Sequence, residues 1–348
     1  MPVGCHDQIA MIKSSALPPA VVALTLRQWL RKNLFSGPLN SLLTLGCLLL
    51  IAWGGGNLLH WSFGVAQWGV IQENFPRFFV GRYPQDQWWR LGVLLVLILG
   101  TVATALWAHQ KRRLGSILLA LPFISAIALW LIGGGLGLAT VPTSLWNGLL
   151  LTLLVSFSST VLAFPLGVAL AVARQRQELP ILQLLSTGYI ELVRGLPLIG
   201  ILFMAQIMVP LVLPQGWQWD RLLRAIAGLV LFNAAYLAEN VRGGLQAIPK
   251  GQTEAAQSLG LNPLLTLGLV VLPQALRIAI PAIAGQFIAL FKDTALLSLF
   301  ALLELTGIAR SVLAQPQFLG RYNEVYLFIG MIYWLFCFGL SRMSRRLE

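Results

Sequence analysis

Residues 254–260 read Glu-Ala-Ala-Gln-Ser-Leu-Gly, and after nine more residues the chain continues Val270-Val271-Leu272-Pro273. This polar stretch stands between long apolar segments in a chain of 348 residues that is 57% hydrophobic and only 10% charged. Soluble domains are about a quarter charged, so the composition predicts a protein embedded in a membrane. A polar segment of such defined sequence in this chain indicates contact with something outside the bilayer.

The order of residues around Glu254 predicts a short, capped helix. Residues 253–259 favour helix, and Gly260 suits the left-handed position that commonly follows a helix end. Two helical turns are marginal in water, so this helix needs a surface to lie on. Ala255 and Ala256 would let a partner approach closely, and Glu254 would bind the partner's main chain or a basic side chain. On physical grounds alone, a surface helix without a partner is the alternative.

Apolar runs that approach the roughly 20 residues needed to cross a bilayer recur along the chain. They predict an all-α, polytopic membrane protein with about eight transmembrane helices, at residues 39–56, 91–108, 116–138, 146–172, 196–214, 222–243, 279–302 and 325–341. Prolines inside several spans predict kinks or breaks, because proline removes a backbone donor. Packing kinks and breaks along a substrate path are both compatible with that pattern.

The net charge of +12 follows membrane topology. Positive clusters gather in alternate loops and near the ends of the chain, as expected of cytoplasmic segments. They are Lys111-Arg112-Arg113, Arg174 and Arg176, Arg242 with Lys250 and Arg277, and Arg342 with Arg345 and Arg346. The intervening loops carry charges of both signs. We therefore expect both termini and the loop around residue 254 to be cytoplasmic, and no cleaved signal peptide before the first span.

The sequence divides near residue 140. Residues 1–140 hold three predicted spans and an aromatic-rich loop at about 57–90 that should lie outside the cytoplasm. The aromatic residues of this loop favour an interfacial belt or an amphipathic helix on the membrane, and a surface for docking a receptor is the alternative. Residues 141–348 hold the other five spans and the cytoplasmic coupling loop, here 246–273.

Charged residues inside or beside the spans form a second group of candidates. Lys292 and Asp293 interrupt an apolar run, where unpaired charges cost several kcal/mol. Adjacent helical side chains diverge, so each should meet a partner on another span, or the helix should break there. Two further pairs are spaced i,i+3 near predicted cytoplasmic ends and could form local ion pairs, Glu191 with Arg194 and Glu239 with Arg242. We interpret these as gate or scaffold pairs rather than as direct substrate ligands.

Several classes of activity find no support in the sequence. It lacks the glycine-rich phosphate loop that ends in Gly-Lys-Ser or Gly-Lys-Thr, so ATP hydrolysis would have to come from another subunit. Its three histidines and three cysteines are scattered without metal-ligand spacing, so we expect no metal site. The basic residues are not interleaved with aromatics as in a nucleic-acid-binding surface.

Three more segments carry a family resemblance. They are 191–198, reading ELVRGLPL; 238–245, reading AENVRGGL; and 291–296, reading FKDTAL. With the 254–273 motif they make residues 146–346 resemble the transmembrane domain of permease subunits of amino-acid ABC importers, in the polar and histidine-type group. The three additional N-terminal spans are similar to those of the larger permeases of general L-amino-acid importers. The group often has threonine where Leu196 stands, which weakens any transfer of substrate choice.

The resemblance implies the type I ABC importer fold for the last five spans and a non-enzymatic translocation subunit in a bacterial inner membrane. Its expected partners are a cytoplasmic ATPase dimer that binds ATP and Mg²⁺, a second permease, which a homodimer could replace, and a periplasmic amino-acid-binding protein. This chain itself should bind no cofactor. The residues expected to couple to the ATPase are Glu254, Ala255, Ala256, Gly260, Leu272 and Pro273. Those expected along the substrate path or gate are Glu191, Arg194, Glu239, Arg242, Lys292, Asp293 and Thr294.

Two other classes of protein compete with this interpretation. An ion-driven secondary transporter would need a central ionisable site and often an inverted repeat. Lys292 and Asp293 are its one candidate site, and no repeat is apparent. A structural membrane scaffold would leave the charged residues and the 254–273 motif unexplained.

Overall fold

The structure is a computed structural model that describes residues 25–110, 114–176, 178–214, 216–217 and 219–347. Two segments predicted to be cytoplasmic lie outside this part: the basic cluster at 111–113 and the N-terminal residues before 25. Throughout the described residues the regular structure is helical, with no strand. The all-α fold is therefore confirmed. Contacts divide the chain into two compact units, Met1–Ala66 and Gln67–Glu348, which we describe separately.

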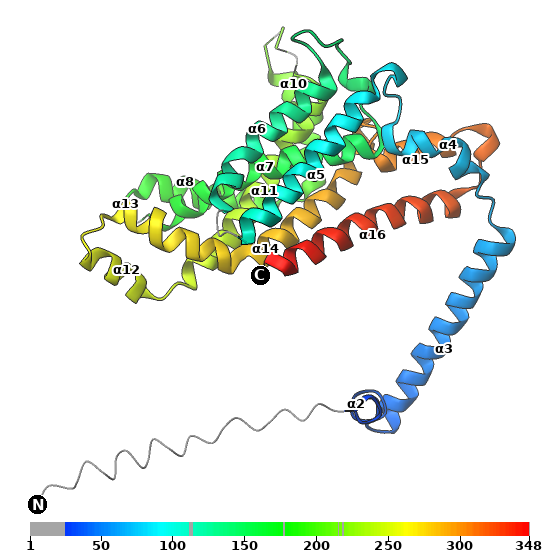
Figure 1. Cartoon of the computed structure of the whole chain (residues 1–348), viewed down its shortest axis with the longest axis horizontal. Helices are drawn as coiled ribbons and strands as arrows, with labels where there is room; N and C mark the ends of the chain where they lie inside the picture. The colour runs from blue at the N-terminus through cyan, green and yellow to red at the C-terminus, as the bar shows by residue number, and fades with distance from the viewer. Residues whose placement is uncertain (1–24, 111–113, 177, 215, 218, 348) are drawn as a thin grey trace, which may run out of the picture. The chain divides into compact units, whose positions relative to one another are not determined.

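The first unit holds two helices, α2 (Leu26–Asn33) and α3 (Pro38–His60), and a π-helical turn η1 (Trp61–Val65). Thr25 caps α2 through a reciprocal pair of hydrogen bonds with Gln28. The Thr44 hydroxyl donates to the Leu34 carbonyl at 2.8 Å and joins α3 to the end of α2. The run Pro38–Val65 is long and apolar enough to cross a membrane (Figure 1).

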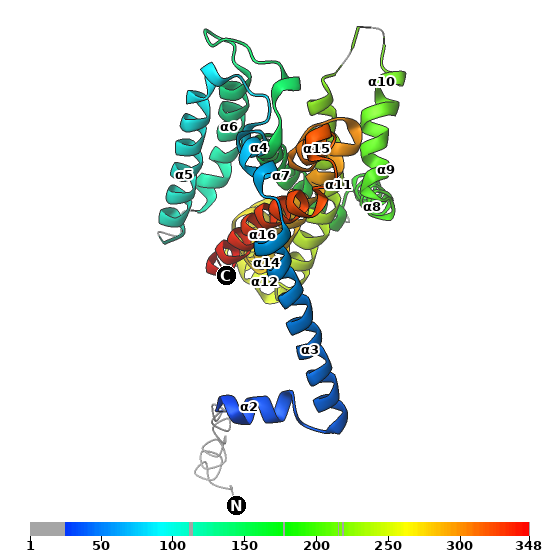
Figure 2. The same ribbon diagram turned by 90° about the vertical axis from the view of Figure 1, so that its right-hand side faces the viewer.

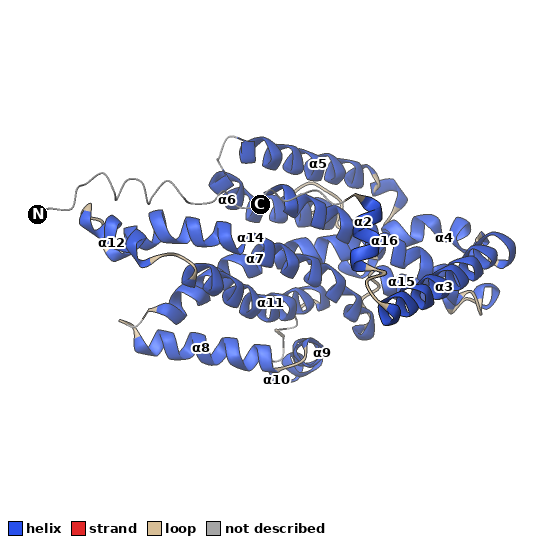
Figure 3. Cartoon of the chain, turned by 90° about the horizontal axis from the view of Figure 1, so that it is seen from below, coloured by secondary structure: helices blue, strands red, loops and turns tan. Residues whose placement is uncertain are grey.

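The second unit is built around α7 (Gly148–Gln175), α11 (Arg221–Gln246), α14 (Leu272–Asp293) and α16 (Tyr322–Leu347). Helices α7 and α11 form its centre because small residues let them approach closely. A Cβ atom on Gly167 of α7 would lie 2.7 Å from the Leu237 Cβ atom of α11. Buried leucine, valine and alanine side chains of both helices fill the surrounding core. Figure 3 shows the helices of this unit from below.

The N-terminal extension contributes α4 (Gly69–Val80), η2 (Gln85–Gln87), α5 (Trp89–Gln110) and α6 (Leu114–Gly133) to the same unit. Figure 2 shows α5 and α6 side by side, next to α7. The Ser125 hydroxyl on α6 bonds that of Ser158 on α7 at 3.1 Å, and the Tyr83 hydroxyl donates to the Ile132 carbonyl at 2.9 Å. The first bond ties the extension to α7, and the second joins two parts of the extension. The division near residue 140 stays a prediction from the sequence.

Each of the eight predicted spans coincides with a helical segment. By length and composition, five of the described helical runs can cross a membrane, or six if one bent pair is a single span. Helices α5 and α6 are not among these, and the residues that join them, 111–113, lie outside the described part. The bent pair consists of α8 (Pro180–Gly195) and the run α9 (Leu198–Phe203), η4 (Met204–Met208) and α10 (Val209–Val212), which meet at 104°.

Short elements complete the second unit: η3 (Thr143–Leu145), α12 (Lys250–Ser258), α13 (Pro263–Leu265), η5 (Thr266–Val271), η6 (Thr294–Phe300), α15 (Leu305–Leu313) and η7 (Pro316–Phe318). Figures 1 and 3 place α12 at one end of this unit and α4 with α15 at the other. The long helices run between these two ends, so the polar α12 and the α4 segment of the extension lie at opposite ends of the unit.

Candidate functional site

Helix α12 carries the Glu-Ala-Ala motif that begins at Glu254. Pro249 occupies the position before the first residue of the helix, Lys250. The predicted left-handed cap is present, with φ of +83° at Gly260. The Gly260 amide donates to the Gln257 carbonyl at 2.9 Å, and the Leu261 amide donates to the Ala256 carbonyl at 3.2 Å. This pair of bonds satisfies carbonyls that the helix end would otherwise leave free.

The two alanines of the motif have different surroundings. Ala256 is 4% exposed and lies on the face of α12 that contacts η5, whereas Glu254 and Ala255 are exposed. Ala256 thus packs against its own chain, and the approach of a partner to both alanines stays a prediction. The difference between Ala255 and Ala256 follows from helical spacing, because a helix that packs against its own chain directs one residue of each turn inward. Ala256 anchors the helix, and the other side remains available for a partner.

The second half of the motif belongs to a helix rather than to a loop. Residues 263–300 form one helical run, with Leu272 and Pro273 in the first turn of α14. The predicted loop 246–273 is thus helical from Pro263 to its end. The Gln274 side chain on α14 donates to the Gln252 side-chain oxygen on α12 at 3.2 Å. This bond joins the two halves of the motif into one structure, which we call the coupling segment (residues 246–273).

Five charged residues form an ionic cluster where α7, α8 and α11 meet. Arg174 of α7 binds Glu191 of α8 at 3.0 Å and Glu239 of α11 at 3.4 Å. Glu239 also receives Arg194 of α8 at 3.6 Å and the Nε of Arg242, on its own helix, at 3.0 Å. The predicted local pair of Glu239 and Arg242 is confirmed.

The other predicted local pair, Glu191 with Arg194, does not form among the described ion pairs. Arg194 instead crosses to Glu239 on α11 and lies over the Tyr236 ring, 5.5 Å from its centroid. Glu191 turns to Arg174. Sequence spacing shows which side chains are neighbours on one helix, but not the stronger partners that a second helix brings.

The ionic cluster matters more for the positions of the helix ends than for the stability of the fold. Its side chains are between 23% and 64% exposed, so solvent screens the attraction between them. It nevertheless fixes the ends of three helices relative to one another. Arg174 is the member that the sequence analysis used only for topology and missed as a site residue. The sequence contained a signal for Arg174. Pairing within each helix joins two arginines to the two glutamates and leaves the third arginine without a carboxylate.

The charged break predicted at Lys292 and Asp293 is present. The α-helix ends at Asp293, and the chain continues as the tighter 3₁₀ helix η6. Thr294 is fully buried and its hydroxyl donates to the Phe291 carbonyl at 2.7 Å. The ion pairs of the described residues include neither Lys292 nor Asp293, so the expected partner on another span is not found in that part of the chain. Lys292 is exposed, on a helical run that buries little of its surface within this chain.

Comparison with known proteins adds to this geometry. Residues 163–348 match the family of binding-protein-dependent transport system inner membrane components. The chain belongs to this family. It is 42% identical over 337 residues to the inner membrane amino-acid ABC transporter permease protein YhdY of Escherichia coli (strain K12), covering 92% of this chain and 91% of that protein.

Two further comparisons bear on the whole chain and on its fold. The permease is 34% identical to the glutamate/glutamine/aspartate/asparagine transport system permease protein BztC of Rhodobacter capsulatus, over 92% of each protein. It also resembles a crystal structure of an amino acid ABC transporter with histidines, with a TM-score of 0.52 and 29% identity. That likeness covers 58% of this chain and 91% of the other. The predicted fold and permease class are confirmed, and the secondary transporter is not favoured.

Proposed function

We propose that this permease carries amino acids inward across the bacterial inner membrane, and that its substrates are polar L-amino acids. The names of the full-length relatives support this substrate class, because one is an amino-acid permease and the other is named for glutamate, glutamine, aspartate and asparagine. In this proposal both termini are cytoplasmic and the α4 end of the second unit faces the periplasm.

The proposed assembly contains this permease, a related second permease, two cytoplasmic ATPase subunits and a periplasmic amino-acid-binding protein. ATP and Mg²⁺ bind to the ATPase, and this chain holds no cofactor of its own. The absence of a phosphate-loop sequence in the chain supports that division of work. The exposed Lys292 and the half-buried Asp293 fit a surface that a second permease or the water-filled substrate path completes.

The observation that supports this function best is the construction of the coupling segment. Helix α12 is short, polar and exposed, yet it is held by the left-handed cap at Gly260, by the buried Ala256 and by the bond between Gln274 and Gln252. A helix of nine residues would not keep its shape alone in water. Its rigid attachment, with Glu254 on the open side, suits it to transmit movement from a docked ATPase to α14.

The test is charge reversal on α12 in cells that make the whole importer. Glu254→Lys should leave the permease in the membrane at the normal level, because the substitution lies outside the spans. Recovery of the ATPase with the permease should fall at least tenfold, since interface hot spots commonly contribute about 2 kcal/mol or more. Gly260→Asp should act alike, because a side chain strains the left-handed cap and redirects the helix end. Amino-acid uptake should fall with both variants.

Glu178→Lys provides the matched control. Glu178 is an exposed glutamate in the loop between α7 and α8, with a side chain 73% exposed, and it lies outside the coupling segment. It should retain normal ATPase recovery and uptake. Normal ATPase recovery and uptake in Glu254→Lys and Gly260→Asp would contradict the proposed coupling. Recovery of the permease with copies of itself as its sole permease partner would replace the heterodimer with a homodimer.

A further inference from the structure

A cavity of about 330 Å³ opens at the end of the second unit opposite α12. The start of α7, the start of α11 and the turn after η6 surround it. Its floor is buried, since Asn147, Leu222 and Leu302 are 1%, 4% and 9% exposed. Its rim is charged and exposed. The residues that matter to its chemistry are Arg82, Thr143, Asn147, Asp220, Arg221 and Leu302.

The rim has an excess of positive charge. Both oxygens of Asp220 are already used, because one accepts from the Leu222 amide at 2.7 Å and the other from the Thr143 hydroxyl at 2.6 Å. Arg82 and Arg221 take part in none of the ion pairs found among the described residues. Two guanidinium groups therefore stand at one cavity without a carboxylate of their own.

The N-terminus of α7 reinforces this charge. Asn147 precedes the 28-residue helix, but its side chain caps no amide there. Its amide nitrogen donates back to the Ser144 carbonyl at 3.0 Å, and its buried Oδ1 atom has no hydrogen-bond partner. The beginning of a long helix carries a partial positive charge, which favours an anion nearby. The helix start and the rim thus favour an anion, whereas the free Oδ1 atom of Asn147 is an acceptor that suits a donor group such as an ammonium.

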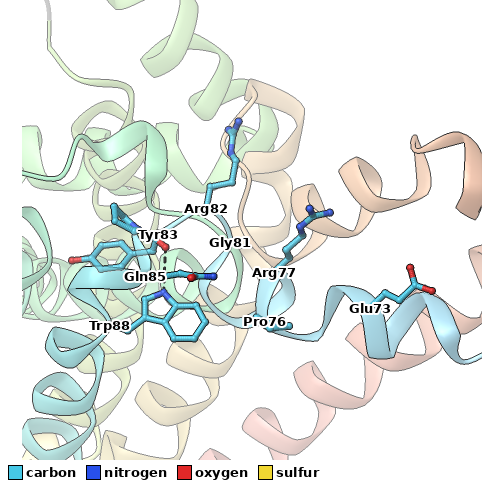
Figure 4. A pocket seen from close by; sticks show the side chains of 9 residues that line it. Glu73, Pro76, Arg77, Gly81, Arg82, Tyr83, Gln85 and Trp88 are labelled. Carbon is cyan, nitrogen blue, oxygen red and sulfur yellow. Dashed lines mark hydrogen bonds between the residues drawn. The ribbon is translucent and has the colours of Figure 1, made fainter.

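Arg82 reaches this cavity because the extension is pressed against the start of α7. Gly81 has φ of +62°, and a Cβ atom on it would lie only 2.1 Å from the Asn147 Cβ atom. Only glycine permits this approach, and it fixes the backbone next to Arg82. Arg82 also borders a second cavity of about 460 Å³ together with Arg77, Tyr83 and Trp88 (Figure 4). Figure 4 shows Arg77 and Arg82 extending to the same side of this segment.

We propose that the 330 Å³ cavity binds the carboxylate of an amino acid at the outer mouth of the permease, with Arg82 and Arg221 as its cations. This inference rests on the proposed function and extends it. It gives the extension a role, because the extension supplies one of the two cations and α11 supplies the other. Arginine suits the task, since its planar fork matches a carboxylate.

The shape of the cavity favours a small ligand over an acidic side chain of a docked protein. Its volume is at the lower end of the range for small-molecule sites, about 300–1,000 Å³. Its floor lies among buried residues of three separate elements. An amino acid with a second carboxylate can use both arginines, so acidic amino acids should bind better than their amides.

The test measures binding of tritiated L-glutamate and L-glutamine to the permease–ATPase complex in nanodiscs, without the binding protein. Arg82→Gln should weaken glutamate binding about fivefold, as expected for a partly exposed ion pair, and glutamine binding less. Arg82→Lys should restore part of the affinity. Arg77→Gln is the matched control, because Arg77 is an exposed arginine of the same extension that borders the other cavity alone.

Each outcome of this test is decisive. Equal glutamate affinity in Arg82→Gln and Arg77→Gln, in a complex that still transports amino acids, overturns the carboxylate site and leaves the proposed function intact. A wild-type importer that moves no amino acid overturns the proposed function instead. If Arg82→Gln weakens recovery of the binding protein but leaves glutamate binding unchanged, the arginine serves protein docking and the small-ligand site is wrong.

Discussion

At the scale of a single residue, Glu304 is the most unusual side chain of the second unit. It is fully buried where α15 begins, outside the predicted spans. The Thr306 and Gly307 amides donate to its carboxylate at 2.8 Å each, and the Tyr333 hydroxyl of α16 donates at 3.0 Å. Burial raises the pKa of Glu304 to about 7, although these hydrogen bonds and nearby Arg310 oppose the rise. A carboxyl group that titrates near neutral pH thus joins two helices.

The raised pKa predicts that the stability of the second unit depends on pH. The folded protein keeps a proton on Glu304 that the unfolded chain releases above about pH 4.5. The stabilisation is therefore complete below about pH 4.5 and is lost as the pH rises through about 7. Between pH 5 and pH 8 the free energy of unfolding should fall by on the order of 3 kcal/mol at most, and the unfolding temperature of the purified permease in detergent should fall with it.

Glu304→Gln should flatten this dependence, because its side chain is neutral at every pH. Glu324→Gln replaces another buried carboxylate of the same unit and separates the effect of Glu304 from general loss of a buried charge. Wild-type and Glu304→Gln proteins whose unfolding temperatures change equally with pH would show that Glu304 does not carry the effect.

At the scale of the helix, the contact between α11 and α14 depends on one glycine. A Cβ atom on Gly244 would lie 2.3 Å from the Ala275 carbonyl oxygen and 3.1 Å from the Ala279 Cβ atom. Its neighbour Gly243 has no atom within 4 Å of the corresponding position. The pair Gly243-Gly244 therefore contains one glycine that packing requires and one that it does not.

Gly244→Ala should separate α11 from α14 and destabilise the permease by about 1–3 kcal/mol, as overpacking does in well-packed interiors. Gly243→Ala should be neutral or slightly stabilising, because alanine favours helix and meets nothing there. The measurements are the yield of monodisperse protein in detergent and its unfolding temperature. Equal behaviour of the two variants would mean that the helices do not approach as closely as described.

The helices show what local sequence can and cannot predict. The spans and the cap at Gly260 were predictable because apolar runs and glycine act within a few residues. The inward turn of Ala256 and the crossing of Arg194 to Glu239 were not. Each depends on which faces of distant segments meet, and one sequence does not contain that information in a local pattern. The burial of Glu304 escaped prediction for the same reason.

At the scale of the whole molecule, the two ends of the second unit should face opposite sides of the membrane. Figures 1 and 3 place α12 and α4 at those two ends. Gln257 on α12 and Gln85 in η2, which follows α4, are exposed residues. In a chain whose native Cys5, Cys47 and Cys337 are replaced, a cysteine at position 257 should react with reagent from the cytoplasm. One at position 85 should react from the periplasm.

The same experiment extends to Arg112, which lies outside the described residues and which the charge pattern predicts to be cytoplasmic. A cysteine there should behave like the one at position 257. Periplasmic labelling at position 257 would invert the topology and remove the basis for ATPase coupling through α12.

The contact of Gly81 with Asn147 also has a practical consequence for building chimeric transporters. A designer guided by the predicted division of the sequence would exchange the N-terminal portion at about residue 140. That junction would separate two segments that pack closely. A Cβ atom on Gly148 would lie 2.7 Å from the Phe78 carbonyl oxygen, and Gly81 has no room for a side chain beside Asn147. A better position for the junction in a chimeric permease is the boundary of the two compact units, between Ala66 and Gln67.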